Sequence, residues 1–181
     1  MPSPTLAGFL DPKVVVGVGQ LAVCNDVSVT LATYSLGSCI AVTVYDPVAR
    51  VGGLLHAMLP DSGIDPAKGA AKPAMFMDTG LPALIRAACQ LRAQPHRLEI
   101  CVAGGAQVLD QSGFFNIGKR NYAALTDLLS QYGLRIRAEQ VGGLNSRSVY
   151  LRLGSGEVRL KISGQTGEYI LCASLMPTLT R

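Results

Sequence analysis

The sequence predicts an α/β fold, a layered sandwich of mixed or antiparallel β-sheets with helices packed outside. Short segments rich in β-branched residues recur along the chain, and turn signals separate most of them. Only two segments repeat their apolar residues with helical spacing. Consecutive strands joined by short turns pair antiparallel, and an amphipathic helix buries its apolar stripe against a sheet. We therefore expect roughly eight strands and two helices.

The first third of the chain is predicted to contain strands and turns alone. Strands are expected at residues 14–24, 27–33, 39–45 and 50–59. The Gly-Val-Gly in the first strand is not a dinucleotide-binding fingerprint, because a third glycine and a following helix are missing. Gly37 lies in the short loop of residues 34–38, and Asp46-Pro47 begins the turn between the last two strands.

A long loop and a helix are expected next. Residues 60–74 are rich in Gly, Pro, Asp and Lys, which is typical of a lid or binding loop. A helix follows, with Asp78-Thr79 as its N-cap pair and Pro82 tolerated in its first turn. Its apolar stripe consists of Leu81, Leu84, Ile85, Ala88 and Leu91.

The second half of the chain alternates between strands and one further helix. Residues 97–106 predict a strand that ends in a glycine turn, and residues 112–121 predict a polar loop. A helix over 121–133 ends at Gly133. The remaining strands are expected at residues 134–143, in a hairpin over 147–162 around Gly154-Ser155-Gly156, and in the tail at 168–175.

Bulk properties bound the function. We expect one domain over residues 1–181, with residues 1–12 and 164–181 at its margins. A net charge of +4 comes from scattered Lys and Arg, which argues against a nucleic-acid-binding stripe. No apolar run is long enough to cross a bilayer and the N-terminus does not resemble a secretory signal, so we expect no membrane insertion and a cytoplasmic protein.

The cysteines argue against a scaffold of disulfides or zinc. There are five of them, widely spaced and without a Cys-x-x-Cys pair. In a reducing compartment we expect free thiols, most of them buried in the core.

One cysteine, Cys39, is predicted to lie beside a histidine, His56. If Asp46–Ala49 form a four-residue turn, Tyr45 opposes Arg50. The numbers of opposed residues keep a constant sum in an antiparallel pair, so Cys39 then opposes His56, with Cβ atoms roughly 4.5–5.5 Å apart. A bulge, for example at Gly52-Gly53, would put the two side chains on opposite faces. The alternative is a core hairpin in which Cys39 only packs and His56 bonds a backbone group.

The surroundings of Cys39 favour catalysis. The residue follows Gly37-Ser38 at the start of a strand, where backbone N–H groups of the turn can stabilise an oxyanion. A neighbouring imidazole can take the thiol proton and lower the pKa of the thiol. The imidazole needs a group that fixes its tautomer, and the residues alone leave Thr30, Thr33, Ser35 and Ser38 as candidates. His96, in a loop, is expected to be a surface residue.

The stretch "TYSLGSCIAVTVYDPVARVGGLLHAMLPDSG" resembles the signature of the CheD family of chemoreceptor glutamine deamidases. The matching positions are Thr33, Gly37, Ser38, Cys39, Asp46, Pro47, Gly52, Gly53, His56, Met58, Leu59 and Pro60. The resemblance continues in "FMDTG", "AGGAQVL", "NIGKRN" and "GGLNSRSV" and spans roughly residues 14 to 162. It departs at Tyr34-Ser35, where the family often has Leu-Gly.

The resemblance implies a site and a reaction. Cys39 would be the nucleophile, His56 the general base and acid, and Thr33 the residue that orients the imidazole, with Ser38 and Gly37 supporting the oxyanion. The implied fold is similar to that of bacterial deamidase toxins. The implied substrates are glutamine side chains on the cytoplasmic helical bundle of chemoreceptors, and neither a metal nor an organic cofactor is expected.

The resemblance also implies a second partner, a CheC-type phosphatase. One alternative is therefore a non-enzymatic adaptor that binds and regulates such a phosphatase. Another is proteolysis or transamidation by the same three residues, since fold analogy cannot separate cysteine chemistries.

Overall fold

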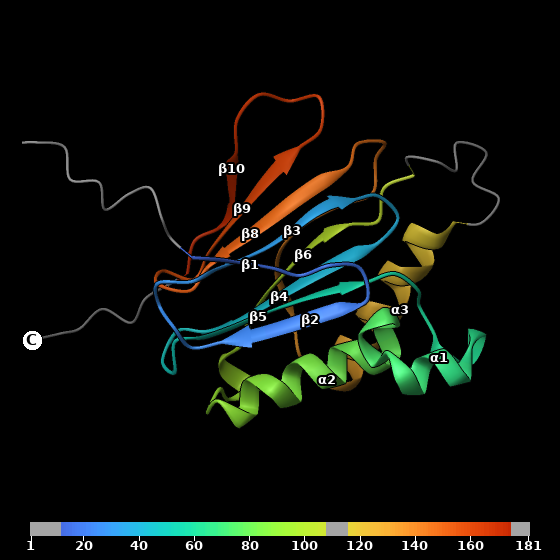
Figure 1. Cartoon of the computed structure of the whole chain (residues 1–181), viewed down its shortest axis with the longest axis horizontal. Helices are drawn as coiled ribbons and strands as arrows, with labels where there is room; N and C mark the ends of the chain where they lie inside the picture. Colours follow the sequence, from blue (N-terminus) through green and yellow to red (C-terminus); the bar gives the residue numbers. More distant parts are fainter. Residues whose placement is uncertain (1–11, 108–115, 175–181) are drawn as a thin grey trace, which may run out of the picture.

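The computed structural model describes residues 12–107 and 116–174, which stack in three layers (Figure 1). A five-stranded sheet, sheet A, faces a second five-stranded sheet, sheet B. Helices α2 (Met77–Gln90) and α3 (Ile117–Gln131) cover the other face of sheet B. The prediction of a layered α/β sandwich with helices outside is confirmed.

Sheet A is built mainly from the C-terminal half of the chain. Its strand order is β1 (Lys13–Val15), β3 (Thr30–Leu36), β8 (Arg147–Arg152), β9 (Glu157–Ile162) and β10 (Tyr169–Cys172). Strands β1 and β3 pair parallel and the other neighbours pair antiparallel. The β8–β9 hairpin and the strand in the tail lie where the sequence predicted them.

Sheet B carries the hairpin that holds the cysteine and the histidine of interest. Its strand order is β2 (Gln20–Cys24), β5 (Val51–Ala57), β4 (Ile40–Asp46), β6 (Glu99–Gly104) and β7 (Ile136–Val141). Strands β6 and β7 pair parallel, with α3 in the connection between them. The other pairs are antiparallel, so both sheets of the described residues are mixed.

The predicted strand over residues 14–24 is two strands in different sheets. Strand β1 belongs to sheet A, and the chain then turns over residues 16–19 to enter sheet B as β2. Backbone bonds hold both ends of this turn: Val16 N–H donates to Ala32 O at 2.8 Å, and Gly19 N–H donates to His56 O at 2.8 Å. The glycines that interrupt the apolar pattern therefore mark a crossing between sheets.

The predicted loop over residues 60–74 contains short helices. These are η2 (Ser62–Ile64), α1 (Pro66–Ala71) and η3 (Pro73–Met75). The Asp61 side chain accepts a hydrogen bond from Gly63 N–H, and the Asp65 side chain accepts one from Lys68 N–H. An aspartate before a helix satisfies N–H groups that have no partner in the helix, so the residues that suggested a loop act here as caps.

The two longer helices begin earlier than predicted. Helix α2 begins at Met77 after Phe76, which makes no side-chain cap. Asp78 is not an N-cap, because its carboxylate accepts from the N–H of Ser62 at 3.0 Å and from the Ser62 hydroxyl at 2.6 Å. Helix α3 begins at Ile117, within the predicted polar loop of 112–121, and residues 112–115 of that loop lie outside the described residues.

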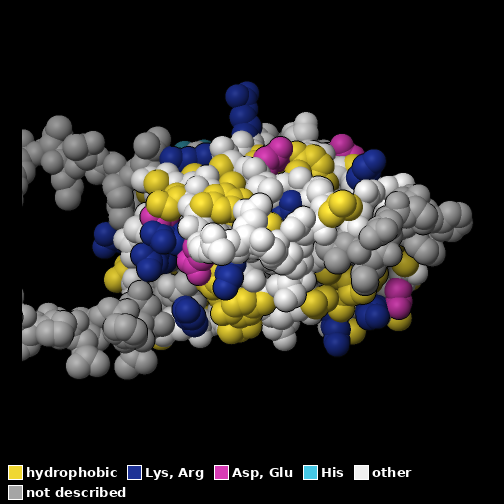
Figure 2. Space-filling model, turned by 90° about the horizontal axis from the view of Figure 1, so that it is seen from above, with side chains coloured by type: hydrophobic (Ala, Val, Ile, Leu, Met, Phe, Trp, Pro, Cys, Tyr) yellow, Lys and Arg dark blue, Asp and Glu magenta, His cyan; other side chains and the backbone are white. Residues whose placement is uncertain are grey.

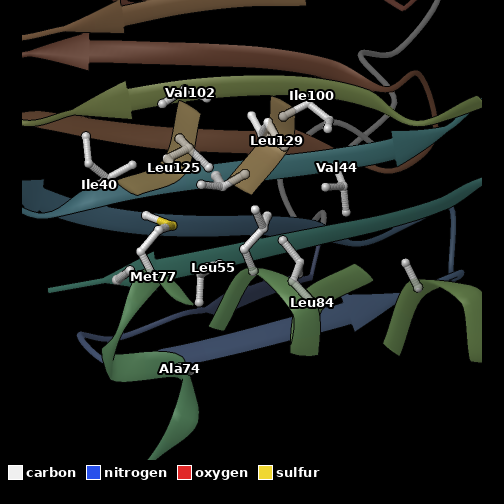
Figure 3. Packing of buried hydrophobic residues seen from close by; sticks show 14 of the residues in the cluster. Ile40, Val44, Leu55, Ala74, Met77, Leu84, Ile100, Val102, Leu125 and Leu129 are labelled. Carbon is white, nitrogen blue, oxygen red and sulfur yellow. The ribbon is translucent and has the colours of Figure 1, made fainter. Parts of the chain in front are cut away.

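Alternate residues of β4 face two different cores. Ile40, Val42 and Val44 pack toward the helices with residues such as Leu84 and Leu125 (Figure 3). Ala41 and Tyr45 face sheet A. Each fully buried leucine contributes about 1.5–3 kcal/mol, so a slip of β4 by one residue would exchange both faces at a large cost.

Basic side chains are scattered on the face of the molecule that Figure 2 shows, in agreement with the sequence. Figure 2 shows Lys and Arg separated by apolar and acidic side chains on one face of the molecule. The two sheets bring three candidate residues to one end of the sandwich. Thr33 lies on β3, Cys39 directly precedes β4, and His56 lies on β5.

Candidate active site

The register of the β4–β5 hairpin differs from the prediction by two residues. Asp46 pairs with Val51 and Ala41 pairs with His56, so His56 does not directly oppose Cys39. The predicted turn of 46–49 is wrong, and the four unpaired residues are 47–50. The ladder has no bulge at Gly52-Gly53.

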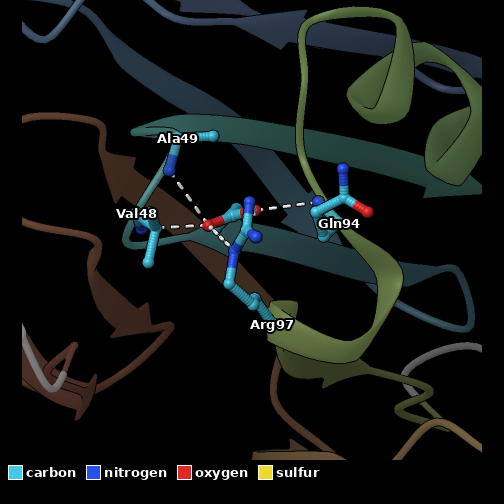
Figure 4. A network of polar contacts seen from close by, with 5 residues as sticks. Val48, Ala49, Gln94 and Arg97 are labelled. Atoms are coloured by element: carbon cyan, nitrogen blue, oxygen red, sulfur yellow. Dashed lines mark hydrogen bonds and ion pairs between the residues drawn. The ribbon is translucent and has the colours of Figure 1, made fainter.

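The side chain of Asp46 explains this register (Figure 4). It is fully buried and accepts hydrogen bonds from Val48 N–H at 2.9 Å and Ala49 N–H at 3.0 Å. Gln94 N–H also donates to it, and Arg97 forms an ion pair with it at 2.7 Å. Burial alone would raise the pKa of Asp46, but these donors together lower it. Asp46 therefore stays in the strand as its last paired residue while the following four residues turn around its carboxylate.

A shift of two residues keeps Cys39 and His56 on one face. Cys39 precedes β4 and packs with Ala41 in the core between the sheets, and Leu54 of β5 faces the same core. His56 lies two residues after Leu54, so its side chain also faces sheet A. The two residues are diagonal neighbours, for which Cα atoms are roughly 7–8 Å apart. The predicted register is therefore wrong, but the prediction that both side chains lie on one face of the sheet is correct.

Thr33 meets His56 across the space between the sheets. Both residues are buried, and Thr33 Oγ1 lies 2.7 Å from His56 Nδ1. The Thr33 hydroxyl also donates to Val16 O at 2.7 Å. Because a hydroxyl has one hydrogen and a carbonyl only accepts, Nδ1 must be the donor to Thr33. This assigns the proton to Nδ1 and leaves Nε2 with a lone pair. Among the described residues Nε2 has no hydrogen-bond partner.

Burial keeps both the thiol and the imidazole neutral. It lowers the pKa of His56 to about 4, although the backbone carbonyl of Val16 acts in the opposite direction. Burial also raises the pKa of the half-buried Cys39 thiol, against our expectation that the imidazole would lower it. The reason is that no hydrogen bond joins Cys39 to His56 within the described part of the chain. Such contacts often tighten only when substrate binds.

The loop before Cys39 is held by the turn after β6. Ala106 N–H donates to Gly37 O at 2.7 Å, and Gly105 N–H donates to Cys39 O at 2.8 Å. In a trans peptide the N–H points opposite to the preceding carbonyl, so Ser38 N–H points away from this turn. No acceptor for Ser38 N–H is present among the described residues. The N–H of Cys39 lowers the pKa of its own thiol, against the larger effect of burial.

Two comparisons with known proteins identify relatives of this chain. The family model described as CheD chemotactic sensory transduction matches residues 58–162. A probable chemoreceptor glutamine deamidase CheD of Solibacter usitatus is 47% identical, covering 87% of this chain and 94% of its own length. This chain belongs to the CheD family. A chemoreceptor glutamine deamidase CheD of Thermotoga maritima is 38% identical, with 84% of this chain and 93% of its own covered.

Comparison with solved structures adds little for this CheD-family chain. A Neisseria meningitidis protein of the family model DUF152 aligns with 73% of this chain and 62% of its own, with a TM-score of 0.44 and 12% identity. That likeness is too weak to support an inference about function. No helix among the described residues is long and apolar enough to cross a membrane. The same residues contain no cluster of three or more His, Cys, Asp or Glu side chains that could hold a metal ion.

Two grooves of this CheD chain lie away from the three candidate residues. One of about 690 Å³ lies between α3 and β7, and one of about 530 Å³ lies between residues 18–21 and 71–74. Neither is lined by Cys39, His56 or Thr33. Hydrogen bonding and burial identify the candidate site.

Arg147 supports the same end of this CheD chain. Arg147 and Ser148 lie in the stretch "GGLNSRSV", which resembles a CheD motif. Arg147 is 4% exposed and donates to the carbonyl oxygens of Gly104, Gly142 and Asn145 and to the side chain of Gln140. Burial lowers the pKa of Arg147. The guanidinium therefore links the turn after β7 to the turn after β6, and the turn after β6 binds the Cys39 carbonyl through Gly105 N–H.

Sequence reasoning missed a buried asparagine, Asn121, which contacts the loop before Cys39. The available signal was its position four and eight residues before the buried Leu125 and Leu129, because a polar residue on the apolar face of a helix needs partners inside the protein. Arg120 and His96 are exposed, as expected for His96.

Proposed function

We propose that this chain is a protein-glutamine deamidase that converts specific glutamines of chemoreceptors to glutamate. Cys39 is the nucleophile, His56 the general base and acid, and Thr33 the residue that orients the imidazole. The observation that carries this proposal is the chain of contacts from Val16 O through Thr33 to His56 Nδ1, which leaves Nε2 free to accept a proton. The printed names of the curated relatives support the substrate.

The first half of the reaction forms a thioester. Cys39 Sγ attacks the carbon of the glutamine carboxamide while His56 Nε2 takes the thiol proton. General-base removal of the proton suits a thiol whose pKa is raised, because no thiolate is present at rest. The N–H groups of Ser38 and Cys39 are the candidate donors to the oxyanion. His56 then protonates the nitrogen, the C–N bond breaks, and ammonia leaves.

The second half restores the enzyme. His56, neutral again, takes a proton from water as the water oxygen attacks the thioester carbon. The C–S bond breaks, the proton returns to the Cys39 sulfur, and the product is a glutamate side chain. Each step uses only the three side chains, the backbone donors and water, so the proposed reaction calls for neither a metal nor a cofactor.

The partner and compartment follow from the proposed reaction. The substrate is the cytoplasmic helical bundle of a chemoreceptor, which places the chain in the cytoplasm. A CheC-type phosphatase as a second partner is a prediction from the family resemblance alone.

The test incubates this chain with a chemoreceptor cytoplasmic fragment and measures both the ammonia released and the masses of the fragment's peptides. We expect activity in the wild type and a loss of both signals in Cys39→Ala and His56→Ala. Cys89→Ala is the matched control, since Cys89 is another half-buried free cysteine. Undiminished ammonia release by Cys39→Ala would overturn the assignment. Cleaved fragments would indicate a protease, and binding without any mass change would indicate an adaptor.

A further inference from the structure

Asn121 contacts the chain on both sides of the candidate site. It is fully buried in the first turns of α3. Its side-chain amide donates one hydrogen bond to Ser38 O at 3.1 Å and another to Met58 O at 2.9 Å. Ser38 directly precedes Cys39, and Met58 follows His56 by two residues. One side chain therefore bridges the segment that carries the thiol and the segment that carries the imidazole.

The bridge lies where the two strands separate. The β4–β5 ladder ends at the pair Ile40 and Ala57. Beyond this pair the Cys39 carbonyl accepts from Gly105 N–H, whereas Met58 N–H donates to Met75 O. The strands thus turn toward different partners just where the site begins. In the described part of the chain, Asn121 is the hydrogen-bonding link between them past the end of the ladder.

The orientation of the Asn121 amide follows from its partners. Ser38 O and Met58 O can only accept, so the NH₂ group must face them, and both of its hydrogens are used. The other end of the amide, Oδ1, is buried and has no hydrogen-bond partner among the described residues. An unpaired buried oxygen offsets part of the stability that the two bonds provide. A purely stabilising role therefore does not explain the carboxamide, whereas a role in holding two strands at a fixed separation does.

Helix α3 holds Asn121 rigidly. One turn before it, Gly118 packs so closely on Gly105 that an added Cβ would lie 2.4 Å from the Gly105 carbonyl oxygen. One and two turns after it, Leu125 and Leu129 are buried against sheet B. The height and rotation of the helix are thus fixed on both sides of Asn121, and its amide cannot follow the strands if they move apart.

We propose that Asn121 is a positioning residue that sets the separation of Cys39 and His56. The proposal rests on the proposed function for its kinetic readout. The diagonal placement of the two residues leaves the thiol and Nε2 without a hydrogen bond at rest, so proton transfer depends on a small approach of the two strands. Losing the bridge lets this separation grow. A misplacement of about 1 Å is enough to cost roughly a hundredfold in rate.

The test replaces Asn121 by leucine, which has a similar shape and no donors. We expect Asn121→Leu to fold, to lose roughly tenfold to a hundredfold in kcat for glutamine hydrolysis, and to keep its KM. Alkylation of Cys39 by iodoacetamide gives a second readout, with Cys24 and Cys89 as internal references. In the wild type, His56 Nε2 assists alkylation when the two strands approach. We expect the pH profile in Asn121→Leu to match that of His56→Ala, because this approach no longer brings the base within reach of the thiol. A merely structural role would not move this profile.

Tyr122→Phe is the matched control. It removes the bond from the Tyr122 hydroxyl to Glu139, which also ties α3 to sheet B but touches neither strand of the site. We expect its kcat and alkylation profile to equal those of the wild type. Wild-type kcat and a wild-type profile in folded Asn121→Leu would overturn the proposal.

A second variant keeps the proposal falsifiable if Asn121→Leu does not fold. Asn121→Ser retains one donor in a smaller side chain, and wild-type kcat in the folded serine variant would equally overturn the proposal. Failure of the proposed function itself is distinguishable. In that case Cys39→Ala would retain glutamine hydrolysis or the wild type would show none, whereas the alkylation profile would still report whether Asn121 couples Cys39 to His56.

Discussion

Thr33 Oγ1 and His56 Nδ1 lie 2.7 Å apart, and this contact joins the two sheets of the sandwich. The partner of the imidazole is a neutral hydroxyl rather than a carboxylate. A hydroxyl fixes the tautomer but gives an imidazolium little charge stabilisation, which agrees with the pKa of about 4 for His56. The candidate pair thus rests as a neutral thiol and a neutral imidazole, and it forms charge only during the reaction.

Removing the Thr33 hydroxyl should separate orientation from packing. Thr33→Val keeps the shape but leaves His56 Nδ1 and Val16 O without their shared partner. We expect kcat to fall by about 10²-fold, since positioned proton transfer contributes about that much. Urea unfolding should show a loss of about 1–3 kcal/mol for the unpaired buried groups. Thr33→Ser, which restores the hydroxyl, should recover most of both. Equal kcat in the valine and serine variants would contradict the orienting role.

The low pKa of His56 predicts a specific loss of stability in acid. The unfolded chain binds a proton at His56 below about pH 6.5, whereas the folded chain binds it only near pH 4. Between these values the unfolded state holds more protons, so the free energy of unfolding falls as the pH falls through this window. The shift corresponds to about 3 kcal/mol. Urea unfolding at several pH values measures it.

His56→Gln is the control for this pH dependence, because glutamine has a similar polarity and does not titrate. We expect its free energy of unfolding to change much less between pH 6.5 and pH 4 than that of the wild type. Parallel curves for the two proteins would show that another group is responsible. Asp46 cannot mimic the effect, because its pKa is lowered from 3.8 and its contribution is lost at still lower pH.

Asp46 should determine the register of the hairpin and hence the site. Asp46→Ala leaves the N–H groups of Val48, Ala49 and Gln94 and the guanidinium of Arg97 without their acceptor. We expect a loss of roughly 3 kcal/mol or more in urea unfolding. Asp26→Ala is matched to it, since Asp26 also accepts from a backbone N–H two residues on but is exposed. Its effect should be much smaller. Equal effects would contradict a structural role for the buried turn.

The sequence predicts the layers of the fold and the common face of Cys39 and His56, but not their spacing, and the residues alone leave several hydroxyl side chains as the partner of His56. The predicted register is off by two residues, and because side chains alternate with a period of two, Cys39 and His56 still lie on one face. The register depended on whether Asp46 lay in the turn or in the strand. The hydrogen bonds of Arg97 and Gln94 to the Asp46 carboxylate keep Asp46 in the strand, and both residues are distant from it in sequence. The contribution of Asn121 could not be predicted for the same reason, since its partners lie on two other strands.

A side chain at Gly104 should displace the loop that carries Cys39. Gly104 has φ +119°, and an added Cβ would lie 2.2 Å from Cys39 O. Gly133→Ala is the matched control, because Gly133 has φ +66° with nothing within 4 Å of an added Cβ. We expect about 1–2 kcal/mol of destabilisation in the control from backbone strain alone, and a clearly larger loss in Gly104→Ala. Only Gly104→Ala should also lose glutamine hydrolysis in its folded fraction, measured as ammonia release per folded molecule. Normal hydrolysis by folded Gly104→Ala would show that the position of the Cys39 carbonyl does not matter for the reaction.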